Sequence, residues 1–257
     1  MKKYLAVFIA FVPFNFARIY LYRALLNYQI EPGAEIAAFN LIDADYFEMG
    51  CASIGYFNLI NAKKVVLKDD VRINKFNRFK SLTELFIGEY SVFVTGNVAY
   101  GTRPNSSPYE DHQCFYVGKN SIITNKHSFD ISDTLTIGDD VTIAGTGTQF
   151  WTHGFDLHHV KIQAGIEIGS HVYIGSSCLV LGGVYVVDNV VIGAGTTVTR
   201  SIDKTGFYVS SVLLRKGDVP NYAESEAITN FKGGIYTRRT MSYASKENIS
   251  TYKVKKS

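Results

Sequence analysis

The side chains best suited to acid–base chemistry in this chain of 257 residues are its six histidines. A neutral imidazole, whose ordinary pKa is about 6.5, can take a proton from a hydroxyl group near neutral pH. His153 is the strongest candidate, because the segment Gly147-Thr-Gln-Phe-Trp-Thr-His153-Gly ends one repeat unit and opens a loop. A side chain there can face a groove, so we predict that His153 is a general base. The alternative is a loop histidine with a hydrogen-bonding role.

A catalytic imidazole is usually oriented by a third group. Asp156 follows His153 by three residues, and the segment His127-Ser-Phe-Asp130 occupies a preceding repeat. We predict that His127 lines the site as a second catalytic residue. The sequence leaves open which of these residues orients His153.

The remaining histidines carry weaker signals. His158 and His159 are adjacent, but a metal pair would need a third ligand, so we interpret them as exposed loop residues and expect no metal site. His171 adjoins a glycine and is expected to be structural, whereas His112 could contact a bound ligand. The three cysteines form no Cys-x-x-Cys pair, and this sparse usage is typical of a reducing compartment.

A strict six-residue repeat positions these side chains. One run of aliphatic residues keeps the period without a break, and it consists of Ile162, Ile168, Ile174, Val180, Val186, Ile192 and Val198. The period matches neither the 3.6 residues of a helix nor the simple alternation of a flat sheet. It fits a coil with three flat faces, in which each aliphatic residue points inward and stacks on its equivalent one coil away. Glycines and small residues allow the corners between faces.

The same period appears earlier in the chain with slips of phase. Each slip marks a loop, and the clearest candidates lie near residues 95–115 and 150–161. The first contains Thr102-Arg-Pro-Asn-Ser-Ser-Pro108, which is rich in turn-forming residues. Loops that leave a regular scaffold are where binding and catalysis are often found.

The two ends of the chain differ from this repeat. Residues 1–30 are predicted to form an apolar helical segment, with a helix from Asn15 to Asn27 and Asn15 as its N-cap. We expect it to pack on the body of the protein or to rest on a membrane surface, because its apolar run is too short to span a bilayer. Residues 31–217 form the repeat domain, and residues 218–257 form a basic tail.

The overall charge excludes one class of partner. Lysine and arginine number 26 against 23 acidic residues, so the net charge is +3. Such a balance gives no electrostatic footprint for a nucleic acid. At 46% hydrophobic residues, the chain can bury a sizeable core.

The repeat region resembles a known family. The segments from Ile168-Gly-Ser-His-Val-Tyr to Gly182-Gly-Val184, and from Val190-Val-Ile-Gly-Ala-Gly to Thr199-Arg200, are similar to the hexapeptide-repeat acyltransferases, and above all to the O-acetyltransferases of sugars and surface polysaccharides. The resemblance covers about residues 30–217 and is strongest over 117–202. It implies an all-β fold, a left-handed parallel β-helix, with a homotrimer as the assembly and acetyl-CoA as the co-substrate.

The resemblance also implies a set of site residues. In this family the catalytic histidine stands on a loop, at the place that His153 occupies here. The residues expected to bind the cofactor are Tyr173, Gly175, Ser176, Gly193, Ala194, Arg200, Arg215 and Lys216. The residues expected to bind the acceptor are Trp151, Asp130, Asp156 and His112. A glutamate common in simpler sugar acetyltransferases is missing near Lys161-Ile-Gln163.

We therefore predict an acetyl-CoA-dependent O-acetyltransferase that acts on a saccharide hydroxyl in surface polysaccharide synthesis. It would work in the cytoplasm, at or near the inner face of the membrane. An N-acetyltransferase of an amino sugar nucleotide shares the fold and the donor, and a non-catalytic β-helix scaffold shares the fold alone. Binding of acetyl-CoA separates the scaffold from the two enzymes.

Overall fold

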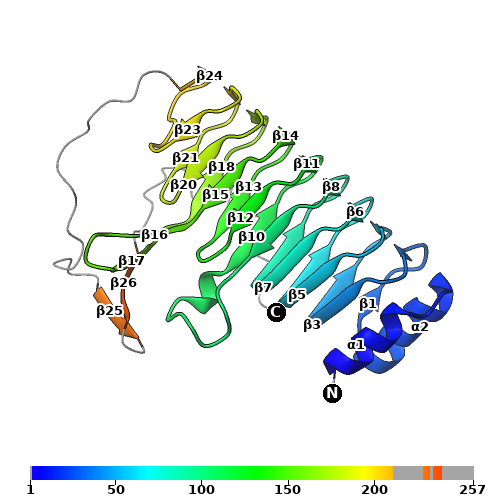
Figure 1. Ribbon diagram of the computed structural model, residues 1–257. Helices are drawn as coiled ribbons and strands as arrows, with labels where there is room; N and C mark the ends of the chain where they lie inside the picture. The colour runs from blue at the N-terminus through cyan, green and yellow to red at the C-terminus, as the bar shows by residue number, and fades with distance from the viewer. Residues whose placement is uncertain (1, 211–227, 232–233, 239–257) are drawn as a thin grey trace, which may run out of the picture.

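The computed structural model describes residues 2–210, 228–231 and 234–238. The repeat winds into a β-helix whose coils stack as parallel strands, and one of its sheets contains nine strands, one from each coil (Figure 1). The prediction of a left-handed parallel β-helix of hexapeptide repeats is confirmed. The predicted basic tail lies largely outside the described residues.

The first flat face, which we call face 1, is this nine-stranded sheet. Its strands pair in parallel through β2 (Glu35–Ile36), β4 (Ser53–Ile54), β6 (Arg72–Lys75), β8 (Val92–Thr95), β11 (Ile122–Asn125), β14 (Thr142–Thr146), β19 (Tyr173–Ile174), β22 (Val190–Ile192) and β24 (Gly206–Tyr208).

A second sheet bends around a corner and forms the other two faces. Three long strands run through the bend: β3 (Leu41–Met49), β5 (Leu59–Leu67) and β7 (Arg78–Ile87). Beyond them, face 2 continues with β9 (Val98–Tyr100), β12 (Ser128–Asp130), β15 (Gln149–Trp151), β20 (Leu179–Leu181) and β23 (Thr197–Val198). Face 3 begins with β1 (Gln29–Ile30) and continues with β10 (Cys114–Val117), β13 (Leu135–Ile137), β18 (Ile166–Ile168) and β21 (Tyr185–Val186).

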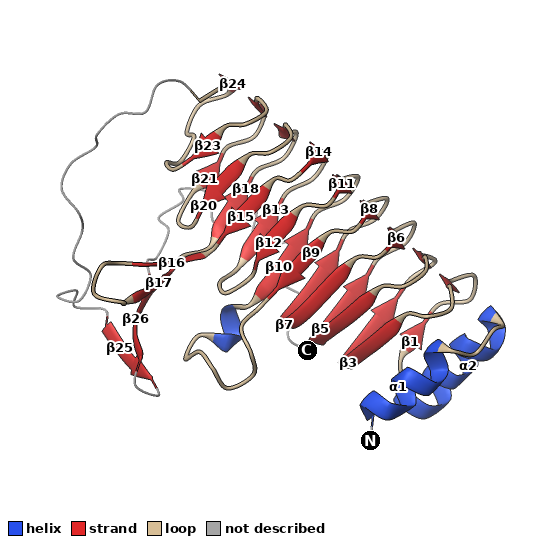
Figure 2. Cartoon of the chain, in the orientation of Figure 1, coloured by secondary structure: helices blue, strands red, loops and turns tan. Residues whose placement is uncertain are grey.

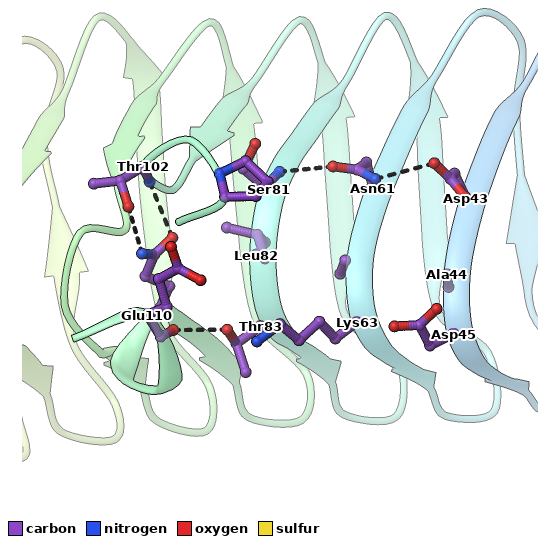
Figure 3. Close-up of a pocket in the computed structure, with 13 residues that line it drawn as sticks. Asp43, Ala44, Asp45, Asn61, Lys63, Ser81, Leu82, Thr83, Thr102 and Glu110 are labelled. Atoms are coloured by element: carbon purple, nitrogen blue, oxygen red, sulfur yellow. Dashed lines mark hydrogen bonds between the residues drawn. The ribbon is translucent and has the colours of Figure 1, made fainter. Parts of the chain in front are cut away.

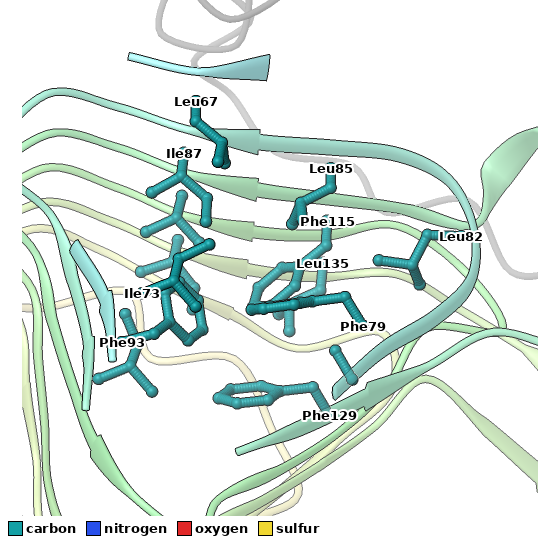
Figure 4. Close-up of a cluster of buried hydrophobic side chains, with 14 of the residues drawn as sticks. Leu67, Ile73, Phe79, Leu82, Leu85, Ile87, Phe93, Phe115, Phe129 and Leu135 are labelled. Carbon is teal, nitrogen blue, oxygen red and sulfur yellow. The ribbon is translucent and has the colours of Figure 1, made fainter. Parts of the chain in front are cut away.

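The core consists of columns of side chains, one residue from each coil. On face 1 the strand register stacks Ile36, Ile54, Ile73, Phe93, Ile123, Ile143, Ile174 and Ile192, each at most 1% exposed. Phenylalanines fill the middle coils, where the Phe93 ring lies 6.0 Å from that of Phe115 (Figure 4). Because each such side chain contributes about 1.5–3 kcal/mol on burial, these columns hold the coils together.

The predicted inward register holds for six of its seven residues and fails at Ile162. Ile168, Ile174, Val180, Val186, Ile192 and Val198 are all buried. Ile162 is half-buried and lies in β17 (Lys161–Gln163), a strand that pairs with β16 (His153–Phe155) outside the coil. Ile162 keeps the six-residue period only by coincidence, because it lies in an insertion and not in a coil. It therefore does not belong to the core.

Two insertions leave the β-helix at one corner, between faces 2 and 3, which we call the insertion corner (Figure 2). The first is a loop over residues 101–113 with one turn of 3-10 helix, η1 (Glu110–His112). The second is an arm over residues 152–165, formed by β16 and β17, and β17 also pairs with β26 (Gly234–Arg238), which pairs with β25 (Ile228–Phe231). The loop predicted at 95–115 is therefore shorter, because β9 remains in the coil. The loop predicted at 150–161 begins later, because β15 remains in the coil, and it continues to residue 165.

The corner between faces 1 and 2, which we call the ladder corner, is held by a chain of hydrogen bonds. A side chain in each coil accepts the backbone N–H of its equivalent in the next coil, at 2.8–3.1 Å. The side chains that accept are Asn40, Asn58, Asn77, Asn97 and His127, and the last N–H belongs to Thr148. Buried backbone donors at this corner are thereby satisfied.

Two helices cover the open end of the first coil. α1 (Lys2–Ala10) packs on β3, and α2 (Asn15–Leu26) packs on β1 and β2. The N-cap of α2 is Phe14, so the prediction that Asn15 caps the helix is wrong. Asn15 instead accepts the N–H of Ile36 and donates to the carbonyl of Ala34, which ties the helix to the coil. No helix among the described residues is long and apolar enough to cross a membrane.

Candidate active site

His153 and Asp130 form a hydrogen-bonded pair at the insertion corner. The distance between His153 Nδ1 and Asp130 Oδ2 is 2.7 Å, and the same oxygen accepts the backbone N–H of His153 at 3.0 Å. Asp130 is 1% exposed, whereas the His153 side chain is 21% exposed. The carboxylate is therefore enclosed, and the imidazole reaches the surface.

Hydroxyl groups hold the carboxylate of Asp130 in place. Ser132 donates its hydroxyl to Asp130 Oδ1 at 2.8 Å, and Thr152 donates its hydroxyl to Oδ2 at 3.0 Å. Burial by itself would raise the pKa of Asp130, but the hydrogen bonds and charge interaction with His153, together with those hydroxyls, lower it below its ordinary value. Asp130 is thus an anion that can only accept hydrogen bonds.

The charge of Asp130 fixes the protonation of the imidazole. Since the carboxylate only accepts, Nδ1 of His153 carries the proton, and the neutral ring has its lone pair on Nε2. No residue of the described chain donates to or accepts from this Nε2. The ring lies 6.1 Å from that of Trp151 and 5.8 Å from that of Phe155, both nearly edge-on. An oriented imidazole with a free acceptor nitrogen can take a proton from a bound hydroxyl group.

The stacking of coils explains why these residues meet. β12 and β15 are neighbours on face 2, and their register pairs Asp130 with Trp151. The arm begins directly after Trp151, so His153 lies next to the end of β12. Gly182, on the following coil, allows the base of the arm to lie close, because an added Cβ would be 2.9 Å from the carbonyl oxygen of Ala164.

The sequence did not reveal several residues that support the pair. Ser132, Thr152 and Gln163 are buried polar residues around Asp130 and His153. Gln163 donates to the carbonyl of Ser132, and the hydroxyl of Ser107 lies 3.3 Å from its Oε1. The signal that could have identified them is the small hydroxyl residue near each member of the pair, in Asp130-Ile-Ser and in Thr152-His.

The structure does not bring His127, the second predicted catalytic residue, together with His153. His127 is 1% exposed, its Nδ1 accepts the N–H of Thr148 at 3.1 Å, and its Nε2 lies 3.0 Å from the hydroxyl of Thr124. Burial lowers its pKa to about 4, so the ring is neutral at neutral pH. Both nitrogens are engaged within the ladder corner, which lies on the other side of face 2 from His153, and we assign His127 a structural role.

The residues expected to bind the acceptor are spread over the insertion corner. Trp151 adjoins His153, whereas Asp130 contacts it directly and is too deeply buried to bind an acceptor. Asp156 accepts the N–H groups of His158 and Val160 and so shapes the tip of the arm. The carbonyl of His112 accepts the hydroxyl of Thr134, which ties the first insertion to the next coil.

The residues expected to bind the cofactor lie elsewhere on the same chain. Gly175, Ser176, Gly193 and Ala194 occupy the ladder corner, and Tyr173 lies beside it on face 1, 44% exposed. Gly175 is packed so closely that an added Cβ would be 2.6 Å from the nitrogen of Ala194.

Of the three basic residues expected to bind the cofactor, the structure describes only Arg200. Arg200 is exposed and follows β23, which ends at the insertion corner. Arg215 and Lys216 lie outside the described residues. Among the described residues, those predicted to bind the cofactor at the ladder corner are therefore separated from His153 within one chain.

A polar hollow of about 200 Å³ lies on the insertion corner beside the first insertion (Figure 3). Asn61 donates to Asp43 at 3.3 Å and accepts the N–H of Ser81 at 3.1 Å, which forms a polar chain across three coils. On the side of the insertion, Thr83 donates to the carbonyl of Glu110 at 2.7 Å. Within the described residues, no group of histidine, cysteine and acidic side chains could hold a metal ion.

Comparison of the sequence with known proteins gives one clear relative. No family model matches the chain. The galactoside O-acetyltransferase of Escherichia coli (strain K12) is 35% identical over 94 residues, which are 34% of this chain and 43% of that protein. The chain thus spans less than half the length of this relative.

Solved structures share the fold. A UDP-N-acetylglucosamine acyltransferase from Francisella novicida superposes with a TM-score of 0.50 at 15% identity, covering 71% of this chain and 63% of the other. A hexapeptide-repeat acetyltransferase from Vibrio cholerae, solved in complex with acetyl coenzyme A, gives a TM-score of 0.41 at 21% identity, over 48% of this chain and 65% of the other. By local sequence and by its β-helix, the chain is therefore similar to the hexapeptide-repeat acyltransferases, sugar O-acetyltransferases among them.

Proposed function

We propose that this protein transfers an acetyl group from acetyl-CoA to a hydroxyl group of a saccharide, in the synthesis of a surface polysaccharide. The observation that carries the proposal is the His153–Asp130 pair at the insertion corner, in which the imidazole is held at Nδ1 and is partly exposed. The similarity to a galactoside O-acetyltransferase supports the acetyl group and a saccharide hydroxyl as its acceptor.

In the proposed reaction, His153 Nε2 takes the proton of the acceptor hydroxyl as its oxygen attacks the thioester carbonyl. Asp130 stabilises the imidazolium that forms, because its carboxylate is already bonded to Nδ1. As the carbon–sulfur bond breaks, His153 returns the proton to the sulfur of the departing thiol. The products are an acetyl ester and free coenzyme A, and His153 is neutral again.

The cofactor would lie between two copies of the chain. Gly175 and Ala194 at the ladder corner are separated from His153 by the width of face 2, whose strands of three residues span roughly 10 Å. A donor that touches both sets of residues is best accommodated where the ladder corner of one copy faces the insertion corner of another. This supports the homotrimer that the family resemblance implies.

The polar hollow supports an extended acceptor. It lies on the insertion corner, as His153 does, and its lining combines carboxylates, two amides, hydroxyls and a lysine. These groups suit the hydroxyl groups of a sugar, which both donate and accept hydrogen bonds. A saccharide of several units could occupy the hollow while its reacting unit lies at His153.

The experiment that tests this function measures release of the thiol from acetyl-CoA against a panel of sugars, oligosaccharides and sugar nucleotides. We expect release to depend on a saccharide and the acetylated product to lose its acetyl group in mild base, as an ester does. A base-stable amide would identify an N-acetyltransferase instead. If none of the saccharides in the panel increased the release of the thiol, the result would count against a saccharide acceptor.

A further inference from the structure

Helix α1 is apolar on both of its sides. Ala6, Ile9 and Ala10 are buried against the β-helix. The opposite side carries Tyr4, Val7, Phe8 and Phe11 at helical spacing, and the exposed fraction of Phe8 is 64%. A helix that is apolar all round is normally enclosed, so the outer side of α1 is expected to contact something beyond this chain.

The exposed apolar surface continues past α1. Phe14, Phe16, Tyr20 and Leu25 are exposed on the turn and on α2, and the rings of Phe14 and Phe16 stack at 5.8 Å. Both helices lie at the end of the stack of coils (Figure 1). This surface is therefore at one end of the molecule, several coils away from His153.

A row of phenylalanines extends the surface along the ladder corner. Phe11 contacts Phe39 at 5.6 Å between ring centroids, and the rings of Phe39, Phe57 and Phe76 stack at 5.2 and 5.3 Å. These three residues have φ of 60–63°, a region that bulky residues rarely adopt. Backbone geometry alone would favour glycine there, as at Gly96 on the next coil. We therefore attribute the presence of phenylalanine to the contacts that its ring makes.

Positive charge borders this surface at two places, at the start of α1 and beside Phe76, whereas Glu31 and Glu35 lie near Phe16 and Tyr20. Residues 1–30 contain no acidic side chain, and Lys2 and Lys3 are exposed at the start of α1. Residues 71–81 also contain no acidic side chain, and Phe76 is flanked there by Arg72, Lys75, Arg78 and Lys80, all exposed. None of these six cations forms an ion pair within the described residues.

We propose that this end of the protein binds the surface of an anionic lipid bilayer. The binding surface, which we call the aromatic end, consists of the exposed apolar residues Tyr4, Val7, Phe8, Phe11, Phe14, Phe16, Tyr20, Leu25, Phe39, Phe57 and Phe76. Aromatic rings bordered by lysine and arginine match the interface of a membrane that carries anionic lipids, where the rings enter the headgroup region and the cations meet phosphate. The sides of the β-helix stay free for other copies.

The test is co-sedimentation of the full chain with vesicles of phosphatidylcholine alone and of phosphatidylcholine mixed with phosphatidylglycerol. We expect binding to the anionic vesicles, weaker binding to the neutral ones, and release by salt. Phe8→Ser and Phe16→Ser should each lower the partition coefficient by at least about tenfold, since burial of a phenylalanine is worth about 1.5–3 kcal/mol. The control is Tyr90→Ser, which removes a ring that is 62% exposed on another corner.

Charge is tested separately. Lys75→Glu should weaken binding to anionic vesicles by at least about fivefold, because each cation near such a surface contributes about 1 kcal/mol. Lys126→Glu makes the same change farther along the ladder corner and should leave binding unchanged. Equal binding by the wild type and the Phe8, Phe16 and Lys75 variants would overturn the proposal. So would a change of oligomeric state in these variants without vesicle binding, because the aromatic end would then join copies of the chain.

Discussion

At the scale of single residues, Asp130 distinguishes His153 from the other histidines. Only His153 combines a buried carboxylate at Nδ1 with a partly exposed ring within the described structure. His171 lies 3.7 Å from Asp140, but the His171 side chain is exposed and that of Asp140 is only half-buried, and such a pair is weakly held. The oriented imidazole explains why a general base would be found at this point of the chain.

The first prediction concerns His153 itself. His153→Ala should keep the fold and the affinity for acetyl-CoA and lose about 10²–10⁴ in turnover, since a general base acts in the transition state. The measurement is kcat with a saccharide found in the acceptor panel. His127→Asn is the control and should retain turnover, because an asparagine can accept the N–H of Thr148 as Asn97 accepts that of His127. A His153→Ala protein with a third or more of wild-type kcat would refute the assignment.

The second prediction concerns the dependence of stability on pH. Burial lowers the pKa of His127 to about 4 in the folded protein, so the unfolded chain binds the proton more readily. The neutral, buried His127 therefore makes the free energy of unfolding depend on pH. Its full contribution is present above about pH 6.5, and roughly 3 kcal/mol of the free energy of unfolding is lost as the pH falls toward 4. Urea unfolding of the wild type and of His127→Asn at several pH values should show a flatter profile for the variant. Identical profiles would mean that His127 is not buried in neutral form.

At the scale of elements, the arm at residues 152–165 carries His153, and the coil that follows supports the arm. Gly182 lies against the base of the arm, where an added Cβ would be 2.9 Å from the oxygen of Ala164 and 3.2 Å from that of Trp151. Backbone atoms cannot yield as a flexible side chain can, so the close contact fixes where the arm leaves the β-helix. The position of His153 thus depends on a glycine about thirty residues away.

The third prediction tests this support. Gly182→Ala should displace the base of the arm, cost about 1–3 kcal/mol of stability and lower turnover. Gly154→Ala lies in the same arm with nothing within 4 Å of its added Cβ, and should leave the melting temperature unchanged. Thermal unfolding and kcat of the two proteins give the comparison. A Gly182→Ala protein as stable and as active as the wild type would contradict the proposed role of this contact.

The elements also show what the sequence could predict. The columns of the core follow from the six-residue period, because each inward residue repeats in the sequence. Ile162 kept that period inside the arm, where no neighbouring coil stacks on it, so periodicity alone placed it wrongly. The partner of His153 depends on which residues meet across neighbouring coils, and a phase slip between Phe129 and Ile131 hid this register. His127 looked catalytic because the ladder that employs it becomes visible only when Asn97 and Thr148 are seen beside it.

At the scale of the whole molecule, the β-helix carries three separate features. The aromatic end covers the two helices and the first three coils, the His153–Asp130 pair lies at a middle coil, and the described residues expected to bind the cofactor lie at the last coils. An enzyme attached to a bilayer by one end could present its active site to glycans assembled at that surface. The attachment and the catalysis rest on different residues, so either can be tested without the other.

The most direct test of the central claim is calorimetric titration of the full chain with acetyl-CoA, because it requires no knowledge of the acceptor. We predict saturable binding and a matching rise in melting temperature, worth about 2.7 kcal/mol of stability at a ligand concentration of about one hundred times Kd. No heat of binding at any temperature tried, together with no change in melting temperature at millimolar acetyl-CoA, would contradict the proposed enzyme and favour a non-catalytic scaffold.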